Sequence, residues 1–326
     1  MPSDAFNRDI SYLRVSLTDA CNLRCVYCMP EHMTFRPREE MLSDAELRRL
    51  ITIFASTGFR KVRFTGGEPT LRPGLVDLVR HAGATPGIEA VGLTTNGVLL
   101  DQLARPLRDA GLGSVNISLD SLDAVTFRRL TRWGNLRDVR AGLDAAASAG
   151  LRIKLNAVVC RGINDGSDVV ELARLTLERN WQVRFIEQMP FGNNSQFQEQ
   201  AMVREDELLE RLADVFGPLE MLHGGCLDGE ARLYQIPGAR GTVGFISPVS
   251  KPFCAGCNRM RLTADGVLRL CLLRDHEVDL RPTLRGGGDD EDLRDLILHA
   301  VREKPWGHGL AHRVIPSARG MSQIGG

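Results

Sequence analysis

The alternation of strand-like and helix-like patterns over residues 1–190 restricts the fold more than any other feature. Six short runs with β-strand character are separated by amphipathic helical patterns. The predicted strands are Ile10–Ser16, Lys61–Phe64, Glu89–Thr94, Ser114–Leu119, Arg152–Val158 and Gln182–Ile186. The predicted helices lie near Asp44–Thr57, Leu75–His81, Leu99–Ala110, Asn135–Ala149 and Asp168–Glu178. Such alternation requires right-handed crossovers and a parallel sheet. Six units leave two alternatives, a partial barrel and an open doubly wound sheet.

Residues 191–326 have a different pattern, with one early helix, short strands and a late helix. The predicted elements are a helix at Glu205–Val215, strands at Arg232–Ile236, Thr242–Ile246, Met260–Thr263 and Val267–Leu270, and a helix at Glu291–Glu303. Asp265-Gly266 is typical of the hairpin turn between the last two strands. We therefore predict two domains, an α/β domain at residues 1–190 and a smaller α+β domain at residues 191–326.

Polar residues recur at alternate positions near the ends of five predicted strands. They are Arg14, Ser16 and Thr18, then Arg63, Thr65 and Gly67, then Thr94 and Asn96, then Asn116, Ser118 and Asp120, and finally Lys154 and Asn156. Alternation places such residues on one face of a strand. Because sites in parallel α/β folds lie at the carboxyl ends of the strands, we expect one polar and partly cationic cavity there.

Charge and cysteine usage narrow the class of protein. Lys plus Arg and Asp plus Glu both number 41, so the formal net charge is zero, which disfavours a general nucleic-acid binder. The sequence contains neither an apolar run of membrane-helix length nor a signal peptide, so we expect a cytoplasmic protein without a membrane partner. Thiols stay reduced there, and clustered cysteines then indicate metal binding. Six of the eight cysteines form two triads, and Cys160 and Cys226 stand alone.

The first triad is Cys21, Cys25 and Cys28, directly after the first predicted strand. Three thiolates are one short of the four that fill a cubane iron–sulfur cluster, which leaves one iron open to a ligand. The alternative is a structural zinc ion. Zinc favours paired C-x₂-C units with a fourth ligand, and His32 is the one candidate nearby.

The second triad is Cys254, Cys257 and Cys271. A second cluster with an open iron and a zinc site completed by His276 are both compatible with it. Arg259 and Arg261 follow Cys257 and share one strand face. Together with Arg14, Arg63 and Lys154, they suit a polyphosphate.

The first triad resembles the signature of the radical S-adenosylmethionine (SAM) superfamily. Its sequence is Cys21-Asn-Leu-Arg-Cys25-Val-Tyr27-Cys28, and Gly66-Gly67-Glu68-Pro69 after the second strand matches the glycine-rich motif of that superfamily. The resemblance implies a partial (β/α)6 TIM-like barrel, here with a smaller C-terminal α+β domain that carries a second iron–sulfur cluster. It also implies that the open iron binds SAM and that one electron cleaves SAM to a 5′-deoxyadenosyl radical.

Within that superfamily, the chain is similar to the GTP 3′,8-cyclase family of molybdenum cofactor biosynthesis nearly from end to end. The matching stretches are Cys21 to Pro30, Phe64 to Thr70, Leu93 to Gly97, Asn116 to Asp120, Lys154 to Asn156, Arg184 to Glu187, Cys254 to Arg261 and the terminal Gly325-Gly326. This similarity implies two [4Fe-4S] clusters on the two triads. It implies SAM contacts at Tyr27, Gly67, Ser118 and Met189. The implied GTP contacts are Arg14, Arg63, Thr94, Lys154, Arg259, Met260 and Arg261.

The implied reaction begins with abstraction of the ribose 3′ hydrogen of GTP by the adenosyl radical. The C3′ radical attacks C8 of guanine, and an electron and a proton complete (8S)-3′,8-cyclo-7,8-dihydroguanosine 5′-triphosphate. Cys21, Cys25, Cys28, Arg259 and Arg261 are the implied catalytic residues. The implied partners are a flavodoxin or ferredoxin as reductant, a synthase that makes cyclic pyranopterin monophosphate, and a second copy in a homodimer. The Gly-Gly tail is expected to enter the active site.

Three other functional interpretations compete with that of a GTP 3′,8-cyclase. A peptide-modifying radical SAM maturase has more auxiliary cysteines than three and forms no cyclised nucleotide. A zinc-bearing nucleic-acid-binding protein is colourless and binds with strong salt dependence. A two-cluster electron carrier does not cleave SAM, and the Gly66–Pro69 motif has no role in it.

Overall fold

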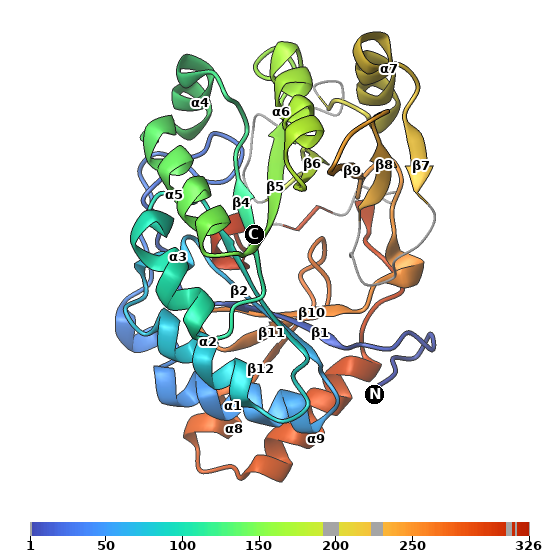
Figure 1. Cartoon of the computed structure of the whole chain (residues 1–326). Coiled ribbons are helices and arrows are strands. Elements are labelled where there is room, and N and C mark those ends of the chain that lie inside the picture. The colour runs from blue at the N-terminus through green and yellow to red at the C-terminus, as the bar shows by residue number, and fades with distance from the viewer. Residues whose placement is uncertain (1, 192–201, 223–230, 311–314, 317, 326) are drawn as a thin grey trace.

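The computed structural model describes residues 2–191, 202–222, 231–310, 315–316 and 318–325. Residues 192–201, together with Cys226, His312 and Gly326, lie outside this described part. One curved sheet forms the centre of the molecule, and its described strands follow the order β12-β11-β10-β1-β2-β3-β4-β5-β6-β9-β8-β7 (Figure 1). Strands from both predicted segments, 1–190 and 191–326, share this sheet.

The strand bounds agree closely with the sequence patterns. The strands are β1 Tyr12–Ser16, β2 Lys61–Thr65, β3 Ala90–Thr95, β4 Ser114–Ser118, β5 Arg152–Val159, β6 Gln182–Glu187, β7 Glu220–Leu222, β8 Arg232–Gln235, β9 Thr242–Ile246, β10 Arg259–Leu262, β11 Val267–Arg269 and β12 Glu277–Asp279. The short edge strands β7 and β12 were not predicted, because three residues are too few to establish a period of two.

The helices are α1 Asp44–Ser56, α2 Leu75–Ala84, α3 Leu100–Asp109, α4 Ala124–Thr131, α5 Leu136–Ser148, α6 Ser167–Glu178, α7 Glu205–Phe216, α8 Arg281–Arg285 and α9 Asp290–Arg302. Helix α1 begins at a capping box in which Ser43 and Glu46 each accept from the other's backbone N–H. Helices α4 and α8 were not predicted. The side chain of Asp123 caps α4 by accepting from the backbone of Thr126, a signal present in the sequence.

Strands β1 to β6 are parallel neighbours in chain order, and helices follow them on the outside of the curved sheet (Figure 1). This arrangement confirms the predicted α/β fold with a partial (β/α)6 barrel. The C-terminal strands extend it at both edges, since β10 pairs parallel with β1 and β9 pairs parallel with β6. The carboxyl ends of these eight strands therefore lie at one rim.

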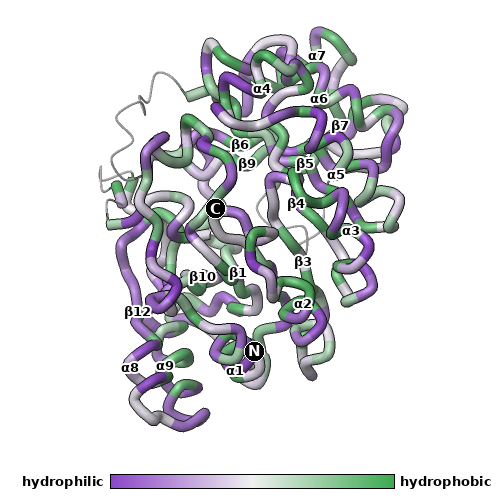
Figure 2. Tube along the Cα trace, turned by 90° about the vertical axis from the view of Figure 1, so that its left-hand side faces the viewer, coloured by the Kyte–Doolittle hydropathy of each residue, from purple (hydrophilic) through white to green (hydrophobic). Residues whose placement is uncertain are grey.

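The core lies between the outer face of the sheet and the helices. It includes Leu13, Val62, Leu93, Val115 and Leu155, which are fully or almost fully buried on neighbouring strands. Figure 2 shows hydrophobic and hydrophilic residues alternating along the chain trace. Such alternation is expected of helices and strands that bury one face and expose the other. Among the described helices, none is both long enough and apolar enough to cross a membrane.

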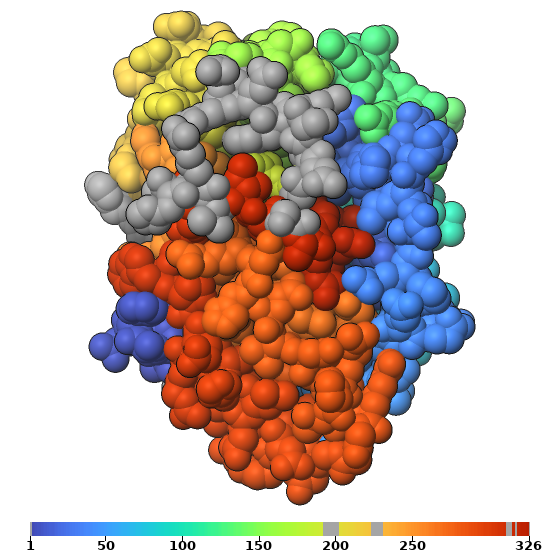
Figure 3. All heavy atoms as spheres, turned by 180° about the vertical axis from the view of Figure 1, so that it is seen from behind, coloured from blue at the N-terminus to red at the C-terminus, as the bar shows by residue number. Residues whose placement is uncertain are grey.

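The opposite face of the sheet faces the C-terminal segment. Viewed from behind, orange and red residues of the last third cover most of the lower surface (Figure 3). The last described residues enter the molecule, and the C-terminus lies near its centre (Figures 1 and 2). The inner face of the barrel is thus enclosed by the chain's own C-terminal segment.

Candidate active site

A cavity lies at the carboxyl ends of the barrel strands, and we call it the main cavity. Most of the residues predicted for SAM and GTP line it, namely Cys21, Cys25, Tyr27, Cys28, Gly67, Ser118, Met189, Arg14, Thr94, Arg259 and Arg261. They come from β1, β3, β4, β10 and the loops after β1, β2 and β6. The predicted strand register is therefore correct for these positions.

The first cysteine triad lies in the loop between β1 and α1. Backbone N–H groups on both sides of Cys25 hold this loop against the end of α4, because Arg24 donates to Thr131 O at 3.1 Å and Val26 donates to Leu130 O at 2.9 Å. Helix α4, which the sequence analysis missed, is thus the support of the cysteine loop.

The three thiols lie in an environment that disfavours the thiolate. Burial raises the pKa of Cys21 to about 11 and that of Cys28 to about 12, and it also raises the pKa of Cys25. The Asp120 carboxylate adds to this effect at Cys25 and Cys28. Thiolates here require a positively charged metal centre, since metal binding and deprotonation are coupled.

Tyr27 connects the cysteine loop to the barrel. Its phenolic O–H donates to Asp120 Oδ2 at 2.7 Å, while Asp120 Oδ1 accepts from the backbone of Val158 at 2.9 Å. Asp120 is 2% exposed, and burial raises its pKa to about 6 despite these two hydrogen bonds. The pair fixes the aromatic residue that precedes the third cysteine.

The Gly66–Pro69 stretch packs tightly against the chain that leads into Cys21. A Cβ atom on Gly67 would lie 2.3 Å from Ala20 O and 2.4 Å from Asp19 O, so only glycine fits. Gly67 donates to Thr18 O at 2.6 Å, and Glu68 donates from its backbone to Ala20 O at 2.8 Å. The glycines therefore bring the β1 and β2 loops together beside the triad.

Glu68 is 1% exposed and joins this loop to the next strand. Its carboxylate accepts from the backbone and hydroxyl of Thr70, the hydroxyl of Thr95 at 2.7 Å and the backbone of Asn96 at 2.7 Å. Burial raises its pKa even so. Glu68 is thereby rigidly placed on the cavity wall.

Three polar oxygens on neighbouring strands of the cavity wall point to an absent ligand. Thr94 Oγ1, Asn116 Oδ1 and Asn156 Oδ1 are buried and have no hydrogen-bond partner in the described part of the chain. Thr94 lies opposite Asn116 in the register of β3 and β4. Buried polar atoms are normally satisfied, so a polar molecule that fills the cavity would satisfy them.

The predicted cationic residues separate into two groups. Arg14, Arg259 and Arg261 line the main cavity, and Arg14 lies opposite both Arg261 and Arg63 in the sheet register. Arg63 and Lys154 are buried but line neither cavity described here. The Arg63 guanidinium is held inside the barrel, where it donates to Tyr12 Oη at 2.8 Å and Leu93 O at 2.7 Å.

The C-terminal tail reaches the same cavity wall. Gly325 O accepts from Arg261 Nη1 at 2.8 Å and from Thr65 Oγ1 at 3.3 Å. Gly325 is buried with φ +75°, and a Cβ atom there would lie 2.8 Å from Thr65 Cγ2. The expected entry of the tail into the site is confirmed as far as Gly325.

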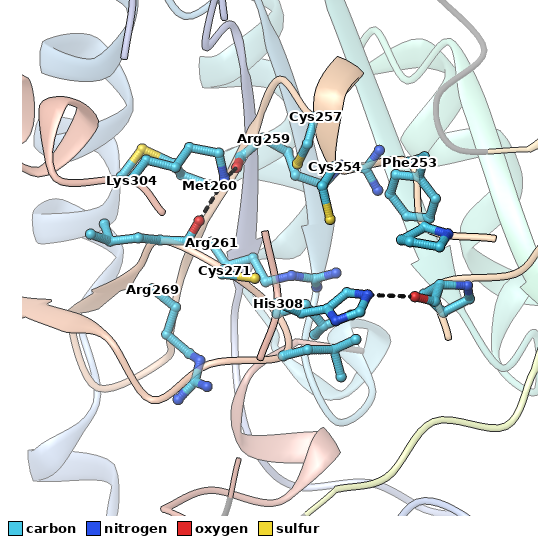
Figure 4. A pocket seen from close by; sticks show the side chains of 15 residues that line it. Phe253, Cys254, Cys257, Arg259, Met260, Arg261, Arg269, Cys271, Lys304 and His308 are labelled. Atoms are coloured by element: carbon cyan, nitrogen blue, oxygen red, sulfur yellow. Dashed lines mark hydrogen bonds between the residues drawn. The ribbon is translucent and has the colours of Figure 1, made fainter. Parts of the chain in front are cut away.

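The second triad lines an adjoining cavity, together with Arg259, Met260 and Lys304 (Figure 4). The two cavities share Pro248, Phe253, Arg259, Arg261 and Leu272 in their walls. The two triads therefore line adjoining cavities, and both arginines belong to the shared wall.

The charge around the second triad differs from that around the first. Burial opposes ionisation of Cys257, yet the charges of Lys304 and Arg259 hold its pKa below the ordinary value. Burial raises the pKa of Cys271, and Lys304 opposes this rise. Cys254 is fixed through its backbone, because its carbonyl accepts from Arg8 Nη1 at 2.8 Å.

The histidines considered as zinc ligands are not placed for that role. His32 and His276 are exposed and line neither cavity. His308 does line the second cavity, but Nδ1 accepts from the backbone of Leu310 at 3.3 Å and Nε2 lies 2.8 Å from Pro248 O. Both of its ring nitrogens are thus engaged.

Each triad suits a cluster. Within the described residues, no group of three His, Cys, Asp or Glu side chains converges closely enough for one metal ion. A cubane cluster takes one thiolate at each of three irons, and three cysteines spread along a cavity wall match that need.

Comparison with known proteins agrees with this geometry. Residues 15–176 match the family model described as the radical SAM superfamily, and residues 181–310 match the model described as Molybdenum Cofactor Synthesis C. The fold and the two matches place the chain in the radical SAM superfamily.

Curated relatives narrow the assignment. The chain is 44% identical to the GTP 3′,8-cyclase of Thermodesulfovibrio yellowstonii and 48% identical to that of Heliobacterium modesticaldum, each over 99% of both chains. It is 48% identical to the enzyme of Pseudomonas putida strain W619 over 94% of this chain and 92% of that one. The chain belongs to the GTP 3′,8-cyclase family.

Solved structures show the same fold at low sequence identity. Streptococcus suis SuiB bound to precursor peptide SuiA matches with a TM-score of 0.64 and 15% identity, over 89% of this chain and 67% of that one. SuiB bound to S-adenosylmethionine matches with a TM-score of 0.56 and 16% identity, over 83% and 63%. These likenesses concern the fold alone.

Several residues of the site were not predicted. Arg184 lines the main cavity from β6, and the alternation of Gln182, Arg184 and Ile186 was a usable signal for it. Asp120 was predicted to face the cavity, but its bond to Tyr27 depends on residues 93 apart. Lys304 carried no sequence signal, since it follows the amphipathic pattern of α9 without belonging to a motif.

Proposed function

We propose that this chain converts GTP to (8S)-3′,8-cyclo-7,8-dihydroguanosine 5′-triphosphate, the first step of molybdenum cofactor biosynthesis. The observation that carries the proposal is the pair of cysteine triads on adjoining cavities that share Arg259 and Arg261. The relatives named GTP 3′,8-cyclase, matched over nearly their full length, support it.

Cys21, Cys25 and Cys28 would hold the cluster that binds SAM, and Cys254, Cys257 and Cys271 would hold a second [4Fe-4S] cluster. When bound, the first cluster supplies one electron to the SAM sulfonium, which releases a 5′-deoxyadenosyl radical. Tyr27, Gly67, Ser118 and Met189 line the main cavity beside the first triad and would position SAM.

GTP would lie between the triads. Arg259 and Arg261 line both cavities, and Arg14 and Arg184 add two guanidiniums in the main cavity, so the phosphates would meet bidentate donors. Thr94 Oγ1 and the amide oxygens of Asn116 and Asn156 would accept from ribose hydroxyls or amino groups. Met260 lines the second cavity beside the second triad. Arg63 and Lys154 are buried but line neither cavity, so they would support the site indirectly, through the sheet that carries it.

The remaining partners follow from this chemistry. A flavodoxin or ferredoxin would supply the electron, and a separate synthase would carry the product to cyclic pyranopterin monophosphate. A cytoplasmic location keeps the cysteines reduced. We also propose a homodimer, on the basis of the family resemblance.

Iron analysis tests the two-cluster assignment. The anaerobically reconstituted chain should hold about eight irons, and alanine substitution of either triad should leave about four. Cys160→Ala is the matched control, because Cys160 is buried and lines neither cavity, so its loss should leave the iron content unchanged. Unchanged iron after loss of Cys254, Cys257 and Cys271 would remove the second cluster from the account.

A further inference from the structure

The two triads lie in opposite electrostatic surroundings. The carboxylates of Asp120 and Glu68 act on the first triad and oppose thiolate formation. The positive charges of Lys304, Arg259 and Arg8 favour the thiolate of Cys257, and that of Lys304 also favours the thiolate of Cys271. Chemically similar ligand sets are thus exposed to fields of opposite sign.

Lys304 contacts two of the chain segments that carry the second triad. It follows the C-terminal end of α9 and is 3% exposed. Its Nζ donates to Arg259 O at 2.9 Å and to Leu270 O at 2.5 Å. Arg259 lies two residues after Cys257, and Leu270 directly precedes Cys271. The ammonium therefore bridges the two chain segments that carry the cysteines (Figure 4).

The ammonium of Lys304 is held by neutral groups. Within the described ranges, no Asp or Glu forms an ion pair with Lys304, and its two hydrogen-bond acceptors are neutral carbonyls. By contrast, Arg8 is paired with the buried Asp4 at 2.5 Å. A buried charge is costly unless it is paired. An anionic group held by the second triad would provide the missing counter-charge.

The other charged groups around Lys304 lead to the same conclusion. Burial holds the pKa of the Lys304 ammonium below its ordinary value, while Cys257 and Cys271 act in the opposite direction and Arg8 and Arg259 act with burial. The Arg259 guanidinium stacks over Phe253 at 5.4 Å and Tyr12 at 5.7 Å. Arg8 and Arg259 are themselves cations, so neither balances the charge of Lys304.

We propose that Lys304 is a positioning residue that raises the reduction potential of the second cluster above that of the first. This inference rests on the proposed function, in which the second triad holds a [4Fe-4S] cluster. Reduction of such a cluster adds one negative charge. A fixed cation in a region of low dielectric stabilises the reduced form, and net charge and hydrogen bonding near the sulfurs tune cluster potentials.

Charge asymmetry between the sites would give the two clusters different tasks. The first cluster must be a strong reductant to cleave the SAM sulfonium, and its acidic, buried surroundings favour a low potential. The second cluster, beside Lys304, would be the easier of the two to reduce. This difference requires no difference in ligand type, because both triads offer three cysteines.

The test is a redox titration monitored by electron paramagnetic resonance, in the full chain with Cys21, Cys25 and Cys28 replaced by alanine. Only the second triad can then hold a cluster. Lys304→Gln keeps amide donors for the two carbonyls and removes the charge, and Lys304→Arg keeps the charge. We expect Lys304→Gln to lower the potential by at least about 59 mV, a tenfold change for one electron. Lys304→Arg should stay near the parent value.

Lys304→Met is a second neutral variant in case the glutamine variant fails to fold. Equal potentials for the parent chain and for a folded neutral variant, at equal iron content, would overturn the role of Lys304. A parent chain that binds no iron, while the unsubstituted chain holds about four, would instead overturn the proposed second cluster. Iron content and potential therefore separate the two failures.

Discussion

The hydroxyl of Tyr27 donates a 2.7 Å hydrogen bond to Asp120, which joins the first cysteine loop to the end of β4 across 93 residues of sequence. Both side chains line the main cavity, and Asp120 is held in turn by the backbone of Val158. This contact therefore helps to fix the position of Cys28 relative to the barrel, beside the backbone hydrogen bonds of the loop to α4.

Tyr27→Phe should weaken both this connection and catalysis. Removing the donor leaves a buried carboxylate with one hydrogen bond fewer, so we expect a loss of about 1.5–3 kcal/mol in the free energy of unfolding. Formation of 5′-deoxyadenosine should also slow. Urea unfolding and product assays measure the two effects. Tyr234→Phe is the matched control, because its hydroxyl lies 3.4 Å from Glu205 and outside the cavity. Equal effects of both substitutions would contradict a special role for Tyr27.

Gly325→Ala should abolish most turnover without unfolding the chain. Gly325 has φ +75°, and the new Cβ would meet Thr65 Cγ2 at 2.8 Å, so the tail must move away from Arg261. A displacement of about 1 Å in an active site costs about 100-fold in rate. Gly320→Ala is the control, because φ is −76° there and the nearest atom to its Cβ is 4.0 Å away. Full activity of Gly325→Ala would show that the tail contact is dispensable.

Arg319 should anchor the tail from outside the cavity. Its guanidinium binds Asp265 at 2.9 Å and Glu277 at 2.9 Å, and its side chain is 10% exposed. Arg319→Ala leaves Glu277 with Arg269 and Asp265 with the more distant Arg36, so we expect a loss of about 1.5–3 kcal/mol and faster hydrogen exchange over residues 318–325. Arg302→Ala, on the exposed end of α9, should change neither. Unchanged exchange in Arg319→Ala would disprove the anchor.

Glu46 should make the free energy of unfolding depend on pH below about pH 4.5. Hydrogen bonds from Arg285, reinforced by the backbone of Ser43, lower the pKa of Glu46 from 4.5 to about 2. The carboxylate therefore stabilises the fold above pH 4.5, and this contribution disappears as the pH falls towards 2. Because Arg285 is 40% exposed, solvent screening limits the contribution to about 1 kcal/mol.

Urea unfolding of the iron-free chain at pH 7 and pH 3 checks this prediction. Glu46→Gln keeps the capping geometry, so it should cost about 1 kcal/mol at pH 7 and less at pH 3. Glu291→Gln, whose partner Arg294 lies 3.3 Å away with both groups exposed, should have little effect at either pH. A Glu46→Gln loss of equal size at both pH values is the contrary outcome.

Local signals were sufficient to predict the barrel and much of the site. Strand and helix periods, the capping box at Ser43 and the spacing of the cysteines are all local, and alternation placed Arg14, Thr94 and Asn116 on the cavity wall. The direction of the Arg63 side chain could not be predicted from the sequence. Alternation gives the face of a strand but not the direction of a long side chain, which here turns to Tyr12 and Leu93.

Contacts between distant segments could not be read from the sequence. The pairing of β10 with β1 joins residues about 250 apart, and it brings Arg261 beside Arg14. The burial of Lys304 depends on the same pairing, because its acceptors belong to β10 and to the residue after β11. A terminal glycine gave no local sign of its contact with Arg261.

Anaerobic turnover tests the central claim most directly. The chain is reconstituted with iron and sulfide, reduced with dithionite and given SAM and GTP, and the products are analysed by mass spectrometry. We predict 5′-deoxyadenosine together with a GTP-derived isomer of unchanged mass and altered retention. A fully reconstituted chain that forms 5′-deoxyadenosine but leaves GTP unchanged, or that forms neither product, would contradict the account.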